Sequence, residues 1–579
     1  MNQVSGVGVS AGRVVGTVLK MAPPVSAPPQ GERLAGGADT AAEAARIKEA
    51  AGVVKAKLQE RAAAATGDSK KVLEATAMMA ADPALTKDAA KRVTDSGASP
   101  ARAVWDAAEK VAEMLKGLGG YMAERANDIY DVRNRIVAEL RGEQPPGVPT
   151  STTPFVLVAV DLAPADTATL DPALVQALVT SEGGPQSHTA ILARQLGLPA
   201  IVAAHGADEI AEGAEVFVDG AAGTVSLEVG DTERQYAATW AERAANPSVF
   251  NGVGKLNDGF SVPLLANIGN AKDAKKAAAA NAEGVGLFRT EFLFLDQADE
   301  PPVEEQEKQY AAVFAEFPGK KVVIRTLDAG ADKPLPFVTD DTEPNPALGV
   351  RGYRTSWHYP DVLTNQLTAI ARAADASEAD VWVMAPMIAT AAESADFAKQ
   401  CTDAGIKRPG IMIEIPAAAL TSDKLLTDAT FASIGTNDLT QYTMAADRQL
   451  GSLAELNDPW QPGLLALVKA SVDGATVAGQ QVAGDATAPD EHHHGDPARP
   501  VGVCGEAAGD PALAVVLVGL GVSTLSMTPR SLANVAEILA SVSKADAVRI
   551  AELALAAPSA ADAKARVREQ IPLLEELGL

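Results

Sequence analysis

The stretch "GIMIEIPAAALTSDKLLTDATFASIGTNDL" (residues 410–439) contains two apolar runs separated by a helical segment. The first run ends in Glu414, and the second ends in Asn437 and Asp438. Short apolar runs of this length, alternating with helical segments, predict buried parallel strands joined by a helix. The stretch therefore predicts one β/α unit whose strands each end in a polar side chain.

The same pattern recurs throughout the chain beyond residue 251. Eight apolar runs alternate with helical segments within about 320 residues, which fits a TIM (β/α)8 barrel with insertions. The runs are "VPLLANIG" (262–269), "GVGLFRT" (284–290), "KVVIRTLD" (321–328), "VWVMAPM" (381–387), "GIMIEIP" (410–416), "FASIGTNDL" (431–439), "VGVCGE" (501–506) and "VSTLSM" (522–527).

Most of these runs end in a polar or charged residue. Asn267, Arg289, Arg325, Glu414, Asn437, Asp438 and Cys504 all stand at such ends. The carboxyl ends of barrel strands form one face, where the active sites of TIM barrels lie. Because a buried charge at a strand end is costly without a role, this face is predicted to be a functional site.

The charged residues at this face indicate the kind of ligand. Arg289, Arg325, Arg351 and Arg448 would converge there, and several guanidinium groups suit a small anion that carries carboxylate and phosphate. A structural ion-pair network is the alternative for one or two of these arginines. Glu414 and Asp438, on adjacent strands, are hard oxygen ligands of the kind that Mg²⁺ binds together with water and phosphate oxygens.

Cys504 ends the seventh apolar run. Such a cysteine is more often a buried packing residue. Beside arginines and a metal site, however, a thiol that acts as an acid or a base becomes a credible interpretation.

The N-terminal part of the chain has a different organisation. Short strand patterns in residues 1–20 and in 148–230 predict one compact β/α domain, and the alanine-rich segment 21–147 predicts a helical bundle inserted into it. Ile129, Val132, Ile136 and Leu140 share one face of a helix in that bundle. A polar helical segment, 231–251, then leads to the barrel at 252–579.

The segment "GGPQSHTAILARQLGLPAIV" (183–202) places a histidine at a predicted helix start. Ser187 is a suitable N-cap, so His188 would lie in the first turn. The free N–H groups and the positive end of the helix dipole disfavour an imidazolium there and favour an anion. This arrangement suits a histidine that accepts a phosphoryl group, although a histidine that only packs at the helix start is the alternative.

The composition limits the partners and the compartment. The net charge of −26 argues against binding to nucleic acid or to an anionic membrane. The two cysteines, Cys401 and Cys504, have no zinc spacing and indicate a reducing compartment. The N-terminus has no signal-peptide pattern, and no apolar run is long enough to cross a membrane, so a cytoplasmic protein is expected.

Taken together, seven blocks of sequence resemble enzyme I of the phosphoenolpyruvate–sugar phosphotransferase system. They are "GGPQSHTAILARQLGLPAIV" (183–202), "GVGLFRTEFLF" (284–294), "RTLDAGADKPLP" (325–336), "NPALGVRGYR" (345–354), "EIPAAAL" (414–420), "SIGTNDLTQYT" (433–443) and "VCGEAAGD" (503–510). The resemblance covers essentially the whole chain in the same domain order. It implies a swivelling β/α phosphohistidine domain with an inserted helical bundle, followed by a phosphoenolpyruvate-binding TIM barrel.

The resemblance also implies a role for each candidate residue. His188 would be the phosphorylated histidine, and Thr167 would contact it. Five residues would bind phosphoenolpyruvate: Arg289, Arg325, Asn437, Asp438 and Arg448. A sixth, Arg351, would lie near it. Glu414 and Asp438 would hold Mg²⁺, and Cys504 would protonate the enolate carbon.

The partners and the hinge follow from the same resemblance. The helical insert would dock the phosphocarrier protein HPr, the barrel would form a homodimer, and segment 231–251 would act as the hinge between the domains. Such an enzyme performs the first step of sugar uptake by the phosphotransferase system.

Two alternatives differ in class. A relative of pyruvate phosphate dikinase or phosphoenolpyruvate synthase would need an ATP-binding domain, for which the chain has no spare length. A non-catalytic sensor of phosphoenolpyruvate would not need His188, Cys504 and the metal pair. The stretch 483–500, with His492, His493 and His494, looks like an insertion before the seventh barrel strand, and a solvated loop is expected there.

Overall fold

The computed structural model divides into two compact units, residues 1–241 and 242–579. The structure describes residues 3–22, 25–64, 67–118, 126–143, 147–149, 151–162, 170–184, 187–246, 248–295, 297–330, 335–339, 342–343, 345–448, 450–483 and 499–579. The expected insertion at 483–500 falls almost entirely outside these residues.

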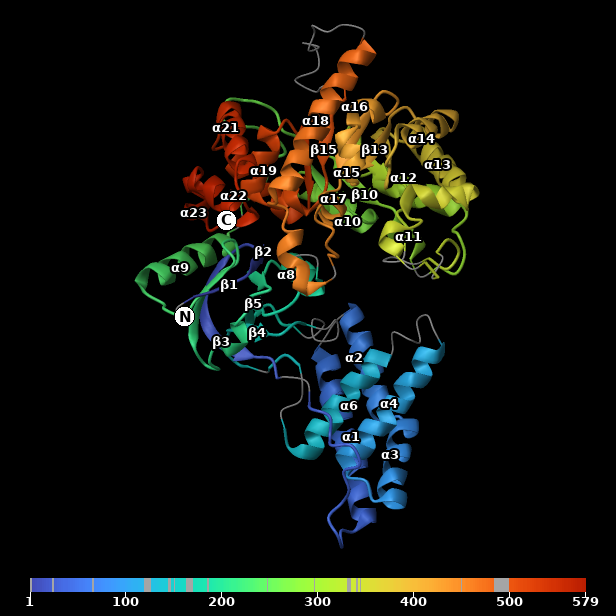
Figure 1. Cartoon of the computed structure of the whole chain (residues 1–579), viewed down its shortest axis with the longest axis vertical. Helices are drawn as coiled ribbons and strands as arrows, with labels where there is room; N and C mark the ends of the chain where they lie inside the picture. Colours follow the sequence, from blue (N-terminus) through green and yellow to red (C-terminus); the bar gives the residue numbers. More distant parts are fainter. Residues whose placement is uncertain are drawn as a thin grey trace. The chain divides into compact units, whose positions relative to one another are not determined.

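The second unit is a closed barrel of eight parallel strands, which confirms the predicted (β/α)8 fold (Figure 1). Each of the eight apolar runs coincides with one strand to within a few residues. In chain order, which is also their order around the barrel, they are β9 (Leu264–Ile268), β10 (Val285–Arg289), β11 (Lys321–Arg325), β12 (Asp380–Ala385), β13 (Pro409–Ile413), β14 (Phe431–Ile434), β15 (Val501–Val503) and β16 (Thr524–Met527). The barrel closes where β16 pairs with β9.

Helices follow the strands and cover the barrel. The longer ones are α10 (Ala271–Ala279), α12 (Val303–Phe314), α13 (Pro360–Asp375), α14 (Ala391–Asp403), α17 (Thr436–Met444), α18 (Pro462–Ala483), α19 (Pro511–Gly519), α20 (Leu532–Leu539), α21 (Lys544–Leu555) and α22 (Ala560–Glu569). The helix α19 is apolar on all sides, and it is buried because it packs against α20, α21 and α22. At Gly519 a Cβ atom would lie 2.0 Å from the carbonyl oxygen of Ala547, so only glycine allows α19 to approach α21 this closely.

The first unit contains a mixed sheet of eight strands in the order β1-β8-β7-β3-β4-β5-β6-β2. Their bounds are β1 (Gln3–Ser5), β2 (Val7–Ser10), β3 (Arg13–Lys20), β4 (Phe155–Ala159), β5 (Val175–Thr180), β6 (Ala200–Val202), β7 (Glu215–Asp219) and β8 (Thr224–Ser226). β3 pairs in parallel with β4, so the N-terminal strands complete the sheet built by the segment after residue 148, as the sequence predicts.

A helical bundle interrupts the sheet between β3 and β4. It contains α1 (Thr40–Ala64), α2 (Gly67–Ala80), α3 (Pro83–Ser96), α4 (Pro100–Leu118) and α6 (Ala126–Arg141). The bundle core consists largely of alanine, valine and leucine, and Ile129, Val132 and Ile136 are buried in it as the helical pattern predicts. The inserted helical bundle is therefore confirmed.

Two further helices belong to this part of the chain: α8 (His188–Leu196) joins β5 to β6 within the sheet, and α9 (Asp231–Ala245) follows its last strand. The hydroxyl of Ser187, the N-cap of α8, accepts a hydrogen bond from the backbone N–H of Ala190. The polar helix α9 has no buried residue. None of the described helices is both long and apolar enough to cross a membrane.

Candidate functional site

The candidate site lies at the carboxyl ends of the barrel strands. Arg289 and Arg325 are the last residues of β10 and β11, Glu414 directly follows β13, and Cys504 directly follows β15. Asn437 and Asp438 lie in the first turn of α17, after β14. Register in a parallel barrel brings these ends to one face, so residues far apart in the sequence become neighbours.

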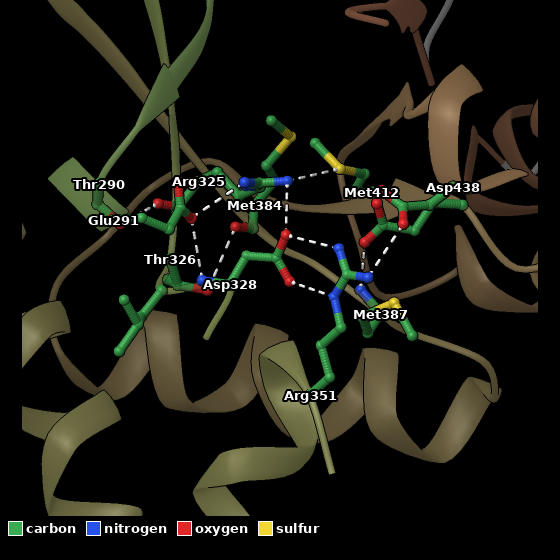
Figure 2. A network of polar contacts seen from close by, with 12 residues as sticks. Thr290, Glu291, Arg325, Thr326, Asp328, Arg351, Met384, Met387, Met412 and Asp438 are labelled. Carbon is green, nitrogen blue, oxygen red and sulfur yellow. Dashed lines mark hydrogen bonds and ion pairs between the residues drawn. The ribbon is translucent and has the colours of Figure 1, made fainter. Parts of the chain in front are cut away.

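Arg325 is held between two carboxylates (Figure 2). Its Nη2 lies 3.0 Å from Glu291 Oε1, and its Nη1 lies 3.1 Å from Asp328 Oδ2. All three side chains are almost completely buried. Burial disfavours the guanidinium charge, but the surrounding carboxylates outweigh that effect and raise the pKa of Arg325.

Asp328 also binds a second guanidinium, that of Arg351. The contact is bidentate, with Arg351 Nε 3.1 Å from Oδ1 and Nη2 3.2 Å from Oδ2. The remaining terminal nitrogen of Arg351, Nη1, donates to Asp438 Oδ1 at 3.0 Å. Figure 2 shows how this arginine connects the end of β11 to α17. Asp438 also contacts Arg448, whose Nη1 lies 3.4 Å from Oδ2.

Glu414 is a fully buried carboxylate with one satisfied oxygen. Oε1 accepts a hydrogen bond of 2.7 Å from the backbone N–H of Met387, a residue with a φ of 61°. Oε2 has no hydrogen-bond partner among the described residues. Burial and the nearby charges of Asp328 and Asp438 raise the pKa of Glu414 to about 8, against the opposing effect of Arg325 and Arg351.

The donor set fits a divalent cation. A cation beside Glu414 and Asp438 would satisfy the buried Oε2 and relieve the repulsion between the carboxylates. No group of three or more His, Cys, Asp or Glu side chains gathers around a possible metal position within the described residues. Two protein carboxylates are the number that Mg²⁺ uses when substrate oxygens and water complete its shell.

The thiol of Cys504 lies among the same charges. Burial is the largest effect on its pKa and raises it, while Arg325 and Arg289 lower it and Glu414 raises it further. The thiol is therefore protonated near neutral pH. Asn437 accepts a hydrogen bond from the backbone N–H of Glu506, two residues after Cys504.

The structure thus brings all of the barrel candidates to one end of the barrel. The ion-pair network suggested as an alternative role for some arginines is present, and it contains Arg325, Arg351 and Arg448. Whether these side chains also bind substrate stays a prediction. The two remaining candidates belong to the other unit. His188 begins α8, but its side chain is not among the described ones, and Thr167 lies outside the described residues.

Three residues at this site were not predicted from the sequence. Glu291 and Asp328 stand two and three residues beyond a strand end, within "FRTEF" and "RTLDAG". Their position just after a charged strand end was a usable signal. Met387 contributes only its backbone N–H, for which the sequence carries no signal.

The arrangement can bind a small, highly charged anion. Several guanidinium groups can bind the negative charges of such a ligand. The two carboxylates can hold a cation that contacts the same ligand. A protonated thiol lies nearby and can donate a proton. This combination suits phosphoryl transfer from a substrate whose product must take up a proton at carbon.

Comparison with known proteins gives consistent matches along the whole chain. Models of PEP-utilising enzymes match as the N-terminal domain (residues 5–125), the mobile domain (152–223) and the PEP-binding domain (248–544). A phosphoenolpyruvate-protein phosphotransferase of Streptomyces coelicolor is 49% identical over 96% of this chain and 97% of its own. One from Haloferax volcanii is 37% identical over 89% of each chain. An NMR structure of an Enzyme I protein covers 42% of this chain and 99% of its own, with 28% identity and a TM-score of 0.37.

We predict that Asp328→Asn destabilises the barrel by about 3–5 kcal/mol, because it leaves two buried guanidinium groups with one carboxylate fewer. The matched control is Asp403→Asn, which removes a carboxylate from an exposed ion pair with Lys399 and should cost less than about 1 kcal/mol. Thermal unfolding of both variants measures the difference. Equal unfolding temperatures would show that Asp328 does not hold the network together.

Proposed function

Because the chain belongs to the phosphoenolpyruvate-protein phosphotransferases, we propose that it takes the phosphoryl group of phosphoenolpyruvate onto His188 and passes it on to an HPr-type phosphocarrier protein. The enzyme class is a phosphotransferase. The named relatives favour this function over a pyruvate phosphate dikinase-like enzyme and over a non-catalytic sensor.

The observation that supports this proposal best is the buried network of arginines and carboxylates at the barrel end. Arg325 and Arg351 share Asp328, and Arg351 extends to Asp438. A ligand with phosphate and carboxylate groups is the natural partner for guanidinium groups arranged in this way. We assign the binding of phosphoenolpyruvate to Arg289, Arg325, Asn437, Asp438 and Arg448, with Arg351 beside them.

We propose that Glu414 and Asp438 hold Mg²⁺. The bound cation would neutralise phosphate charge and favour the loose transition state of phosphoryl transfer. Arg289, Arg325 and Arg448 would orient the substrate and exclude water from it. Asp438 would exchange part of its contact with Arg351 and Arg448 for the cation, which frees positive charge for the incoming phosphate.

The proposed acceptor, His188, stands at the first helical position of α8. The N-terminus of a helix disfavours an imidazolium and favours an anion, so it would suit a neutral imidazole and the phosphate carried on it. A neutral imidazole is the nucleophile that attacks phosphorus in line. Thr167 would support it. Since His188 and the barrel arginines belong to different units of the chain, we propose that segment 231–251 is the hinge that lets them meet and separate.

Cys504 would complete the reaction at the barrel end. Loss of the phosphoryl group leaves an enolate, which becomes pyruvate when its carbon takes up a proton. The buried thiol is protonated near neutral pH, so it holds the proton that this step needs.

The remaining parts of the proposal concern the partners. The inserted helical bundle would dock the phosphocarrier protein, and the barrel would form the interface of a homodimer in the cytoplasm. The domain limits that follow are 1–20 with 148–230 for the phosphohistidine domain, 21–147 for the docking domain, and 252–579 for the barrel.

We predict that Arg448→Ala weakens the binding of phosphoenolpyruvate by on the order of 2 kcal/mol, because one charge-assisted contact is lost. Calorimetric titration in the presence of Mg²⁺ measures this. The control is Arg372→Ala, an exposed arginine that pairs with Glu304 and Glu307 on the outer surface and should not change the affinity. An Arg448→Ala affinity equal to that of the parent chain would refute the assignment.

We also predict that the fragment 1–241 accepts phosphoryl from the phosphorylated phosphocarrier protein but not from phosphoenolpyruvate. The fragment is a compact unit that contains His188 and the helical bundle, whereas every proposed substrate-binding residue lies in the other unit. Mass spectrometry of the fragment after incubation with each donor gives the answer. Phosphorylation by phosphoenolpyruvate, or none by the carrier, would mean that the roles are wrongly divided between the units.

A further inference from the structure

The proposed function leaves the thiolate of Cys504 without a proton after each turnover. The side chain is 2% exposed, and it is surrounded by the charges of Arg325, Arg289 and Glu414 at the substrate side. A ligand bound at these charges would also stand between the sulfur and bulk water. The proton must therefore come from another direction, and the inference below rests on the proposed function of Cys504.

The barrel interior on the other side of Cys504 holds a few hydroxyl side chains among apolar ones such as Trp382 and Phe431. Bulky branched residues dominate the interior of most TIM barrels. Here Ser433 on β14 pairs in register with Gly502 on β15, so no side chain stands beside the serine on that strand, whereas Met412 of β13 stands on its other side. A Cβ atom at Gly502 would lie 2.5 Å from Thr524 Oγ1, which means that the threonine hydroxyl fills the space that a larger residue would take.

These residues line a partly open cavity of about 20 Å³, which is room for one water molecule. Its polar lining residues are Ser433, Thr524, Ser526 and Lys321, and its apolar ones include Trp382 and Phe431. Lys321 and Thr524 are the first residues of β11 and β16, so the cavity extends toward the N-terminal ends of the strands. The substrate face lies at the opposite ends.

Ser433 connects this cavity to the sulfur. It lines the cavity and pairs in register with Gly502, which stands two residues before Cys504 on the same face of β15. Burial raises the pKa of the thiol, and Ser433 opposes this by lowering it. Other contacts fix the position of Cys504. Its Sγ lies 3.6 Å from the carbonyl oxygen of Ile434, and its own carbonyl oxygen accepts a hydrogen bond from Asn267 Nδ2 at 3.0 Å. Asn267 in turn accepts one from Ser526 Oγ at 2.6 Å.

We propose that Ser433 is a positioning residue that delivers protons to Cys504 from the cavity at the N-terminal side of the barrel, away from the substrate. Cys504 gives its S–H proton to the enolate carbon, a C–H bond forms, and the electron pair stays on sulfur. The hydroxyl of Ser433 then passes its proton to the sulfur and takes one from water in the cavity. One proton enters from solvent for each pyruvate formed.

The test uses the full chain with Mg²⁺ and pyruvate in D₂O, and it follows the exchange of the pyruvate methyl protons by NMR. This exchange runs the proton step alone, in both directions, without phosphoryl transfer. We expect Ser433→Ala to slow exchange at least tenfold. It should also move the pH midpoint of the rate upward, because the thiolate loses a hydrogen-bond donor and its pKa rises. Ser433→Thr, which keeps a hydroxyl, should retain exchange.

The control is Ser394→Ala, another fully buried serine in the barrel unit, whose hydroxyl donates to the carbonyl oxygen of Leu425. It should leave exchange unchanged, and Cys504→Ala should abolish it. Parent-like exchange in Ser433→Ala, or equal losses in Ser433→Ala and Ser394→Ala, would overturn the role of Ser433. Parent-like exchange in Cys504→Ala would instead overturn the proposed function of the thiol.

Discussion

One carboxylate, that of Asp328, holds two guanidinium groups in the interior of the barrel unit. Isolated buried charges are too costly to persist, so each member of this group depends on the others. Glu291 completes the shell of Arg325, and Asp438 completes that of Arg351. The network therefore fixes the ends of β10 and β11, the loop that carries Arg351, and the first turn of α17 relative to one another. The positions of the side chains at the proposed binding face therefore depend on this ion-pair network.

The same electrostatics explain why the face suits a cation and an anion together. One oxygen of Glu414 has no protein partner among the described residues, and burial, together with the neighbouring carboxylates, raises the pKa of this residue. Arg289 and Arg448 add positive charge at the rim. A divalent cation beside the carboxylates and a phosphate beside the arginines would satisfy both halves of the group. This complementarity would stabilise charge in a transition state without reorganising the protein.

The architecture was predictable from the sequence because its signals are local. Each barrel strand is a short apolar run, and the polar residue at its end marks the functional face, as for Glu414 after "GIMI" and Arg325 after "KVVI". The N-cap of α8 at Ser187 was predictable for the same reason. The pairing within the site was not. That Asp328 binds two arginines depends on how far apart β11 and the Arg351 loop lie in space, and the hydrogen bond from Met387 to Glu414 comes from a backbone group.

In the proposed function, the barrel face and His188 form one phosphoryl-transfer system within a single chain. It is tested most directly by incubating the full chain with phosphoenolpyruvate labelled in its phosphoryl group, together with Mg²⁺, and locating the label by mass spectrometry under conditions that preserve phosphohistidine. We expect one label per chain, on His188, with release of pyruvate. A label on another residue would contradict this proposal. So would pyruvate release while His188 stays unmodified, or undiminished pyruvate release by the His188→Ala variant.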